Sequence, residues 1–136
     1  DGIMAFWGAP HDVPDGARQA CAAALACQAR LIELNARWKT EGKPELITRM
    51  GLHTARVVIG NIGSKERVNY SAIGDGVNVA ARLESLNKEL GTRVLISQPT
   101  RERLGDAFEC RHVGGHALKG RASTVEVYEL LGEKRG

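Results

Sequence analysis

The sequence has few aromatic residues and no strong excess of charge of either sign. Its 136 residues include two Trp, two Tyr and two Phe, and the formal net charge is only +3. A domain that binds nucleic acid usually concentrates its basic residues on one surface and offers aromatic side chains for base stacking. The composition therefore argues against nucleic acid as a partner, and a salt-dependent binding titration would test that alternative.

Long apolar runs are also missing. No stretch approaches the ~20 apolar residues that a membrane-spanning helix needs, and the first residues do not have the pattern of a secretory signal. We therefore expect no membrane contact by this segment and a cytoplasmic location, while other domains of the parent protein remain free to anchor it. An apolar β-like run begins at residue 3 without a lead-in, which predicts that the natural beginning of the chain is missing.

The cysteines and histidines do not form metal-binding patterns. Cys21, Cys27 and Cys110 lack ligand spacing, and the four histidines form neither an HxxxH nor an HExxH pattern. Cys21 and Cys27 lie in an Ala-rich stretch, which is typical of small buried or half-buried residues. We expect free thiols in a reducing compartment.

Apolar periodicity and turn residues predict an α+β domain over residues 1–136. The composition is 43% apolar and 26% charged, as in ordinary globular domains. Helices are expected at residues 16–40 (with Asp15 as N-cap), from the Gly-Asp-Gly turn at 74–76 to about residue 90, and at residues 99–104. Strands are expected at residues 2–8, 46–63 (one or two), 68–73, 93–97, 108–113 and 124–130. Their irregular alternation and at least one hairpin favour a ferredoxin-like α/β sandwich with a mainly antiparallel sheet.

The most informative stretch is Tyr70–Ala80, where a β-like end passes through a Gly-Asp-Gly turn into a helix. Asn78 and Arg82 are four residues apart, so an amide and a guanidinium point to the same side of that helix. Asp75 is predicted to be its N-cap. A separate apolar stripe predicts the buried side of the helix and consists of Val79, Leu83, Leu86 and Leu90.

Each of the polar residues also has a purely structural explanation. Asp1 can be a surface turn residue, and one carboxylate does not make a magnesium site. Asn78 can simply be exposed, and Arg82 can pair with Asp75, Glu84 or Ser85. The segment Lys119-Gly120-Arg121 is either a charged turn or a place where two cations meet a polyphosphate. From the residues alone, an anion site and a set of ordinary turns remain equally open.

Four sequence blocks occur together and cover nearly the whole chain: DGIMAFWGAP, RMGLHTARVVIGNIGS, RVNYSAIGDGVNVAARLES and LKGRASTVEVYEL. With them the chain resembles the catalytic domain of class III nucleotidyl cyclases, the adenylate and guanylate cyclases. The resemblance implies the ferredoxin-like sandwich of that domain without its N-terminal part, so residues 1–136 would be its C-terminal two-thirds.

The resemblance also implies a homodimer with two active sites at its interface. There, two Mg²⁺ or Mn²⁺ ions held by two aspartates convert a nucleoside triphosphate into its 3′,5′-cyclic monophosphate and pyrophosphate. Asp1 matches the second metal-binding aspartate, and Lys119 matches the lysine that contacts the terminal phosphates. Asn78 and Arg82 match the pair from the partner subunit that orients the ribose and stabilises phosphate charge. Such chemistry needs a positioned nucleophile, metal ions and fixed cations.

Ser71 falls where the family reads the base. Mammalian-type adenylate cyclases have Asp there, many bacterial ones Thr, and guanylate cyclases usually Cys. Because Ser is a short hydroxyl like Thr, it favours ATP over GTP. The first metal aspartate and the base-reading lysine would precede Asp1, so we expect this fragment to be inactive by itself. A guanylate cyclase remains an alternative, as does a catalytically dead cyclase-homology module for nucleotide sensing or dimerisation.

Overall fold

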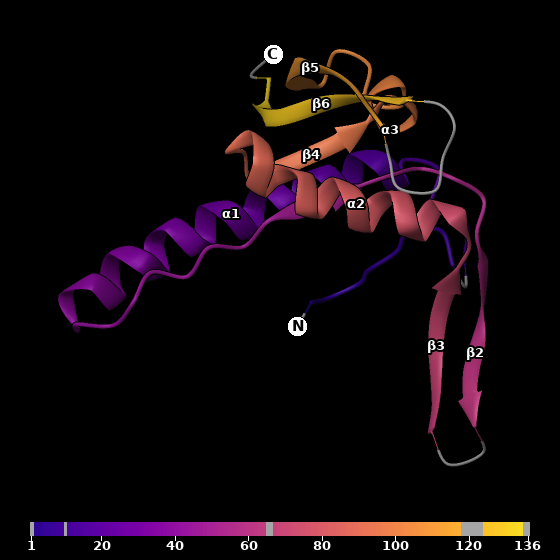
Figure 1. Ribbon diagram of the computed structural model, residues 1–136, viewed down its shortest axis with the longest axis horizontal. Coiled ribbons are helices and arrows are strands. Elements are labelled where there is room, and N and C mark those ends of the chain that lie inside the picture. Colours follow the sequence, from indigo (N-terminus) through magenta and orange to yellow (C-terminus); the bar gives the residue numbers. More distant parts are fainter. Residues whose placement is uncertain (1, 10, 65–66, 118–123, 135–136) are drawn as a thin grey trace.

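The computed structural model describes residues 2–9, 11–64, 67–117 and 124–134, and for residues 62–64 and 67–71 it describes the backbone alone. Its elements, in chain order, are α1 (Gly16–Thr40), β1 (Met50–Leu52), β2 (Val58–Ser64), β3 (Arg67–Ile73), α2 (Asp75–Leu90), β4 (Val94–Ser97), α3 (Gln98–Glu102), β5 (Phe108–Ala117) and β6 (Thr124–Glu133) (Figure 1).

The strands form a four-stranded sheet and a separate hairpin. The sheet has the order β1-β4-β6-β5, and β2 pairs with β3. Only the β1–β4 pair is parallel, whereas β4–β6, β5–β6 and β2–β3 are antiparallel. The predicted α+β fold with a mainly antiparallel sheet is therefore confirmed. In Figure 1 the β2–β3 hairpin extends away from the sheet, below the start of α2.

Strand β4 lies at the centre of two hydrophobic clusters, one on each face of the sheet. Val94 and Ile96 pack with Cys21 and Ala24 of α1. Leu95 points to the opposite face, because successive side chains of a strand alternate. There it packs with residues of α2 and β6, namely Val79, Leu83, Leu86 and Val127. The sheet is thus sandwiched between α1 and α2, which explains why all of β4 is buried.

Helix α1 has the bounds that its sequence predicts. Asp15 occupies the N-cap position but makes no capping hydrogen bond there. Its Oδ1 instead accepts a hydrogen bond from Gln19 Nε2 at 2.9 Å. Cys21 is buried as expected, and burial raises the pKa of its thiol to about 12. Cys27 is exposed, so the expectation that it is buried or half-buried is wrong.

The expected strand at residues 2–8 is absent. Ile3 and Met4 are 99% and 50% exposed. A strand needs a neighbour to complete its ladder of hydrogen bonds, and none of the described strands lies beside this segment. The sequence pattern is that of a strand, but no described strand pairs with this segment.

Strand β5 is longer than expected, because it continues through the glycines that were read as the start of a connection. The ladder between β5 and β6 shifts register between Glu109 and Cys110 and again between His112 and Gly114. Gly114 has φ +100°, a conformation that glycine adopts without strain. The glycine marks a β-bulge within the strand and not its end. In the described part of the chain, no helix is long and apolar enough to span a membrane.

Candidate active site

The Gly-Asp-Gly turn places the start of α2, and each glycine has a separate reason to be there. Gly74 is the N-cap and has φ +146°, which a side chain would strain. A Cβ at Gly76 would lie 2.7 Å from Ala55 Cβ and 3.3 Å from Val57 Cγ1. Asp75 is the first helical residue, so its prediction as N-cap is wrong. At that position its carboxylate still lies at the positive end of the helix dipole.

The core side of α2 follows the predicted stripe for most of its length. Val79, Leu83 and Leu86 are 1%, 0% and 2% exposed, but Leu90 is 36% exposed. The stripe therefore ends one turn earlier than expected. Under the middle of the helix, Gly51 of β1 has room for hydrogen alone, since a Cβ there would overlap the α2 backbone. This close packing fixes the position of α2 on the sheet.

Asn87 is the last buried residue of α2, and it is 0% exposed. Its Nδ2 donates hydrogen bonds to the carbonyl oxygens of Met50, Glu84 and Leu83 at 2.8, 3.1 and 3.2 Å. Its Oδ1 accepts a hydrogen bond from Thr92 Oγ1 at 2.7 Å. A buried amide with these partners joins the end of α2 to β1.

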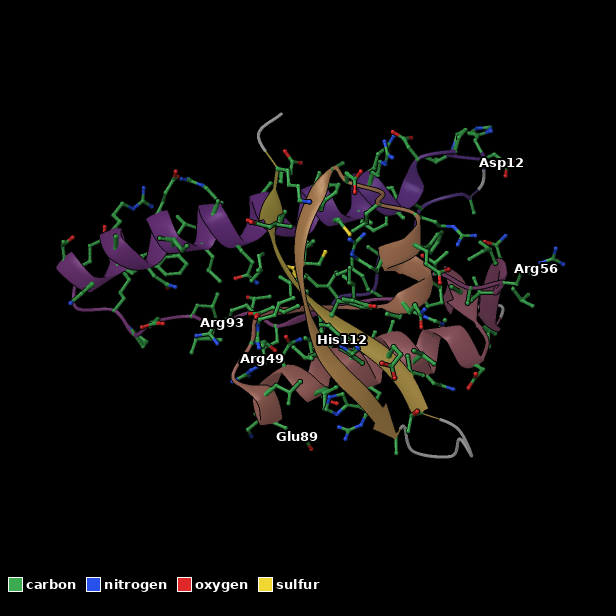
Figure 2. All side chains as sticks on the ribbon, turned by 90° about the horizontal axis from the view of Figure 1, so that it is seen from above. Asp12, Arg49, Arg56, Glu89, Arg93 and His112 are labelled. Carbon is green, nitrogen blue, oxygen red and sulfur yellow. The ribbon has the colours of Figure 1, made fainter. Side chains whose placement is uncertain are left out.

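Asn78 and Arg82 lie on the solvent side of the same helix. Asn78 is exposed, and the Arg82 side chain is 32% exposed. The Arg82 guanidinium contacts Ser85 Oγ at 3.3 Å, as one of its predicted pairings proposed. It also contacts Glu89 Oε2 at 3.3 Å, a partner that was not predicted. Figure 2 shows Glu89 near the far end of α2.

The structure describes little of the other predicted site residues. Asp1 and Lys119 lie outside the described residues. Ser71 belongs to β3, where its backbone is opposite Gly60 of β2, but its side chain is not described. The structure therefore brings together Asn78 and Arg82, and the grouping with the other three residues stays a prediction. Within the described residues, no three His, Cys, Asp or Glu side chains are arranged to hold a metal ion.

A polar cluster beside the start of α2 was not predicted. His53 Nδ1 lies 2.7 Å from Ser97 Oγ, and Thr54 Oγ1 lies 2.8 Å from Thr100 Oγ1. The Ser97 and Thr100 hydroxyls are 3.4 Å apart, and these two residues are 0% and 2% exposed. Two parallel strands, β1 and β4, end side by side here. Because these strand ends are adjacent, the four side chains lie close together. No local sequence pattern predicts this cluster.

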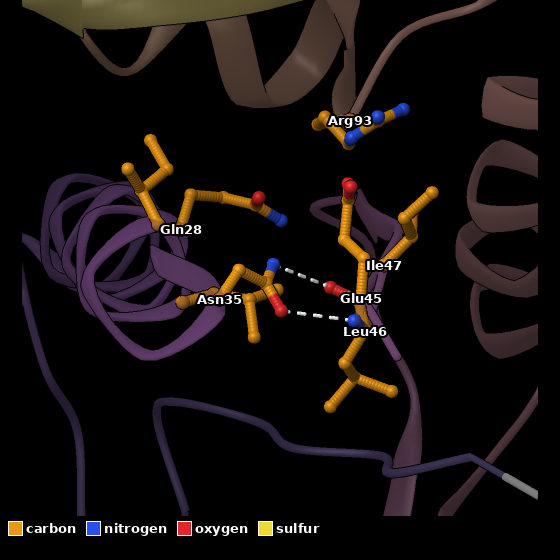
Figure 3. Close-up of a pocket in the computed structure, with 8 residues that line it drawn as sticks. Gln28, Asn35, Glu45, Leu46, Ile47 and Arg93 are labelled. Atoms are coloured by element: carbon orange, nitrogen blue, oxygen red, sulfur yellow. Dashed lines mark hydrogen bonds between the residues drawn. The ribbon is translucent and has the colours of Figure 1, made fainter. Parts of the chain in front are cut away.

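A groove of about 140 Å³ lies elsewhere, between α1 and the segment before β1 (Figure 3). Asn35 binds the backbone of Leu46 in both directions, with Nδ2 donating to the carbonyl at 2.8 Å and Oδ1 accepting from the amide at 2.9 Å. Gln28 Nε2 donates to the Thr48 carbonyl at 2.8 Å. These amide side chains are used to hold the segment against α1. No residue of α2 lines the groove, so it is separate from the candidate site.

The sequence profile of the adenylate and guanylate cyclase catalytic domain matches residues 1–132. The chain belongs to this family. Among the relatives of this cyclase chain, adenylate cyclase 1 of Rhizobium meliloti (strain 1021) is 42% identical over 135 residues, which are 99% of this chain and 20% of that protein. The cyclase chain thus spans about a fifth of the length of that relative.

Solved cyclase structures have the same fold. The adenylyl cyclase CyaB from P. aeruginosa is 29% identical with a TM-score of 0.84, over 95% of this chain and 66% of that one. The guanylyl cyclase Cya2 is 32% identical with a TM-score of 0.81, over 94% of this chain and 64% of that one. The resemblance read from the sequence is confirmed, and so is the ferredoxin-like sandwich of the cyclase domain. Because both kinds of cyclase share the fold, the fold does not select the nucleotide.

Proposed function

We propose that this chain is the C-terminal two-thirds of an adenylate cyclase catalytic domain that converts ATP into 3′,5′-cyclic AMP and pyrophosphate. The observation that carries the proposal is the pair Asn78 and Arg82 on the solvent side of a helix whose other side is fixed in the core. The 42% identity to an adenylate cyclase over 99% of the chain supports adenine as the base.

Cyclisation joins the ribose 3′-oxygen to the α-phosphorus and releases pyrophosphate. The protein's task is to position the ribose and to stabilise the negative charge that develops on the phosphates. The Asn78 amide can hydrogen bond to the ribose, and the Arg82 guanidinium can form charge-assisted hydrogen bonds to phosphate oxygens. The Arg82–Glu89 contact is a partly exposed ion pair, which is a weak interaction. A triphosphate with several negative charges therefore displaces Glu89.

The proposal includes two Mg²⁺ or Mn²⁺ ions. As the resemblance to the cyclases implies, the ions would be held by Asp1 and a second aspartate from outside this sequence. When bound, such ions activate the attacking oxygen and neutralise charge on the leaving group. Lys119 would contact the terminal phosphates and Ser71 the base.

A homodimer completes the proposed site. Asn78 and Arg82 face away from the core of their own chain, and a second copy of the complete domain would supply the metal-holding aspartates opposite them. We place the parent domain in the cytoplasm, where its substrate ATP is abundant, with no contact between this segment and a membrane.

Guanylate cyclase activity is the second candidate, and the 32% identity and shared fold of Cya2 favour it. A catalytically dead module for nucleotide sensing or dimerisation is the third. Product analysis of the complete catalytic domain with ATP and with GTP separates the first two. The absence of both cyclic products, with nucleotide binding retained, identifies the third.

The test is a pair of substitutions in the complete catalytic domain. Asn78→Ala and Arg82→Ala are each expected to lower kcat by about a hundredfold or more, with little change in KM, because the lost contacts act mainly in the transition state. Lys88→Ala is the matched control, since it removes an exposed cation from the same helix. Formation of cyclic AMP with Mg²⁺ or Mn²⁺ is measured by chromatography and mass spectrometry.

Two results would contradict the proposal. If the variants raise KM and leave kcat unchanged, the roles given to Asn78 and Arg82 are wrong. If residues 1–136 alone turn over ATP with either metal ion, the expectation that this fragment lacks part of its active site is wrong.

A further inference from the structure

The segment between β1 and β2, residues 53–57, forms the surface on which α2 begins (Figure 1). If Gly76 had a Cβ, that atom would lie 2.7 Å from Ala55, 3.3 Å from Val57 and 3.6 Å from the His53 ring. The first turn of α2 therefore rests directly on this segment. Asn78 belongs to the same turn, so its position depends on where the segment lies.

The segment contains no helix or strand, so its position must be fixed by other contacts. His53 bonds to Ser97 at 2.7 Å, and Thr54 bonds to Thr100 at 2.8 Å. Ser97 is the last residue of β4, and Thr100 belongs to α3. Both are almost fully buried, where a lost partner leaves a polar group without compensation.

Hydrophobic packing alone would hold the segment less specifically. Thr54 and His53 are adjacent and both bond to hydroxyls that are themselves 3.4 Å apart. A chain of directional bonds permits one position of the segment, whereas apolar contacts permit small slides. The site requires such precision, because a shift of about 1 Å in a reacting group can lower a rate by about a hundredfold.

We propose that the hydrogen-bonded cluster of His53, Thr54, Ser97 and Thr100 is a positioning element of the active site. It holds residues 53–57 against β4 and α3, and these residues set the first turn of α2 and the direction of Asn78. The four residues are positioning residues and do not contact substrate. This inference rests on the proposed function, because it matters for catalysis only if Asn78 orients the ribose.

The direct test is hydrogen exchange of this chain, which needs no catalysis. His53→Ala and Thr100→Val, the second an isosteric loss of one hydroxyl, are expected to speed exchange of the amides from Val77 to Arg82 on the order of fivefold. His53→Asn, which keeps a polar atom near the place of Nδ1, restores slow exchange.

Thr92→Val is the matched control. It also removes a hydroxyl from a buried threonine, but that hydroxyl bonds to Asn87 at the far end of α2. It is expected to lower the melting temperature without faster exchange at the first turn. Unchanged exchange in both His53→Ala and Thr100→Val, or equal acceleration by Thr92→Val, overturns the positioning role.

The link to catalysis is tested by a double-mutant cycle in the complete domain. His53→Ala is expected to lower kcat about tenfold with little change in KM, and His53→Asn to recover most of that loss. In the Asn78→Ala background, His53→Ala should cost little more, because it acts through Asn78. If His53→Ala lowers kcat by the same factor with and without Asn78→Ala, the two residues act independently and the inference is overturned. If Asn78→Ala keeps full kcat, the proposed function fails instead, while the exchange result still decides whether the cluster holds α2.

Discussion

At the scale of single residues, α2 contains two asparagines in opposite environments. Asn78 and Asn87 are about two and a half turns apart and so lie on opposite sides of the helix. Asn78 is exposed, whereas Asn87 is 0% exposed and bonds to three carbonyl oxygens and one hydroxyl. The same side chain is available for a ligand in one place and holds two elements together in the other.

Asn87→Ala is expected to lower the free energy of unfolding by about 2–3 kcal/mol, because it leaves the half-buried Met50 carbonyl and the buried Thr92 hydroxyl without their Asn87 partner. Asn78→Ala is the matched control on the same helix and should change stability by less than about 0.5 kcal/mol. Chemical denaturation followed by circular dichroism measures both. Equal stability of the two variants would show that the Asn87 hydrogen bonds contribute nothing net.

The sequence predicts the buried apolar residues of α2 but not Asn87. Val79, Leu83 and Leu86 follow from helical periodicity. A polar residue is normally read as exposed, and the burial of Asn87 depends on a carbonyl of β1 that lies far away in the chain. For the same reason the cluster around His53 was missed, since its partners are in β4 and α3.

At the scale of elements, the contact between α2 and β1 depends on a single glycine. A Cβ at Gly51 would meet the backbone of α2 at Ala80 and Glu84. Backbone atoms cannot move aside as a flexible side chain does, so the helix would have to lift from the sheet.

Gly51→Ala is accordingly expected to destabilise the chain by about 1–3 kcal/mol through overpacking. Gly132→Ala is the control, because it is also in a strand and a Cβ there meets nothing within 4 Å. Thermal unfolding of the two variants checks the difference. A Gly51→Ala variant as stable as Gly132→Ala would mean that α2 and β1 are not in such close contact.

The helices, whose bounds depend on local sequence periodicity, were predicted better than the strands, whose bounds depend on pairing with other strands. Helix α1 has its predicted bounds and α2 ends at the predicted Leu90, but α2 begins at Asp75, which was expected to be its N-cap. The strand expected at residues 2–8 failed because a strand is completed by its partner. Strand β5 was cut short because Gly114 was read as a turn, whereas pairing with β6 continues past it.

At the scale of the whole molecule, the edge of the sheet at β1 is open. Among the described strands, β1 pairs with β4 alone. Near the start of the chain, Ile3, Met4 and Trp7 are 99%, 50% and 42% exposed. Open edges and exposed apolar side chains both promote association with other chains.

The chain is therefore expected to form assemblies that grow with concentration beyond a dimer. Ile3→Lys is expected to reduce these assemblies, since it replaces a 99% exposed apolar side chain by a charged one. Ile32→Lys, which adds the same charge at a 71% exposed isoleucine of α1, should reduce them less. Sedimentation velocity over a range of concentrations measures the distribution, and a chain that stays monomeric throughout would contradict the expectation.

The candidate site could be predicted from the sequence only where one element carries it. Asn78 and Arg82 share a helix, so their spacing alone places them on one side. Asp1, Ser71 and Lys119 are on other parts of the chain, and no local pattern brings distant segments together. Their grouping came from the resemblance to the cyclases, and it stays a prediction.

The two sides of α2 have a consequence for what likeness of fold can establish. Val79, Leu83, Leu86 and Asn87 support the fold, whereas Asn78 and Arg82 contribute nothing to the core. Substitution of both solvent-side residues would therefore leave the packing of α2 on the sheet unchanged. A chain with this fold could therefore lack Asn78 and Arg82 and still have the same backbone, so likeness of fold alone does not establish the capacity for catalysis.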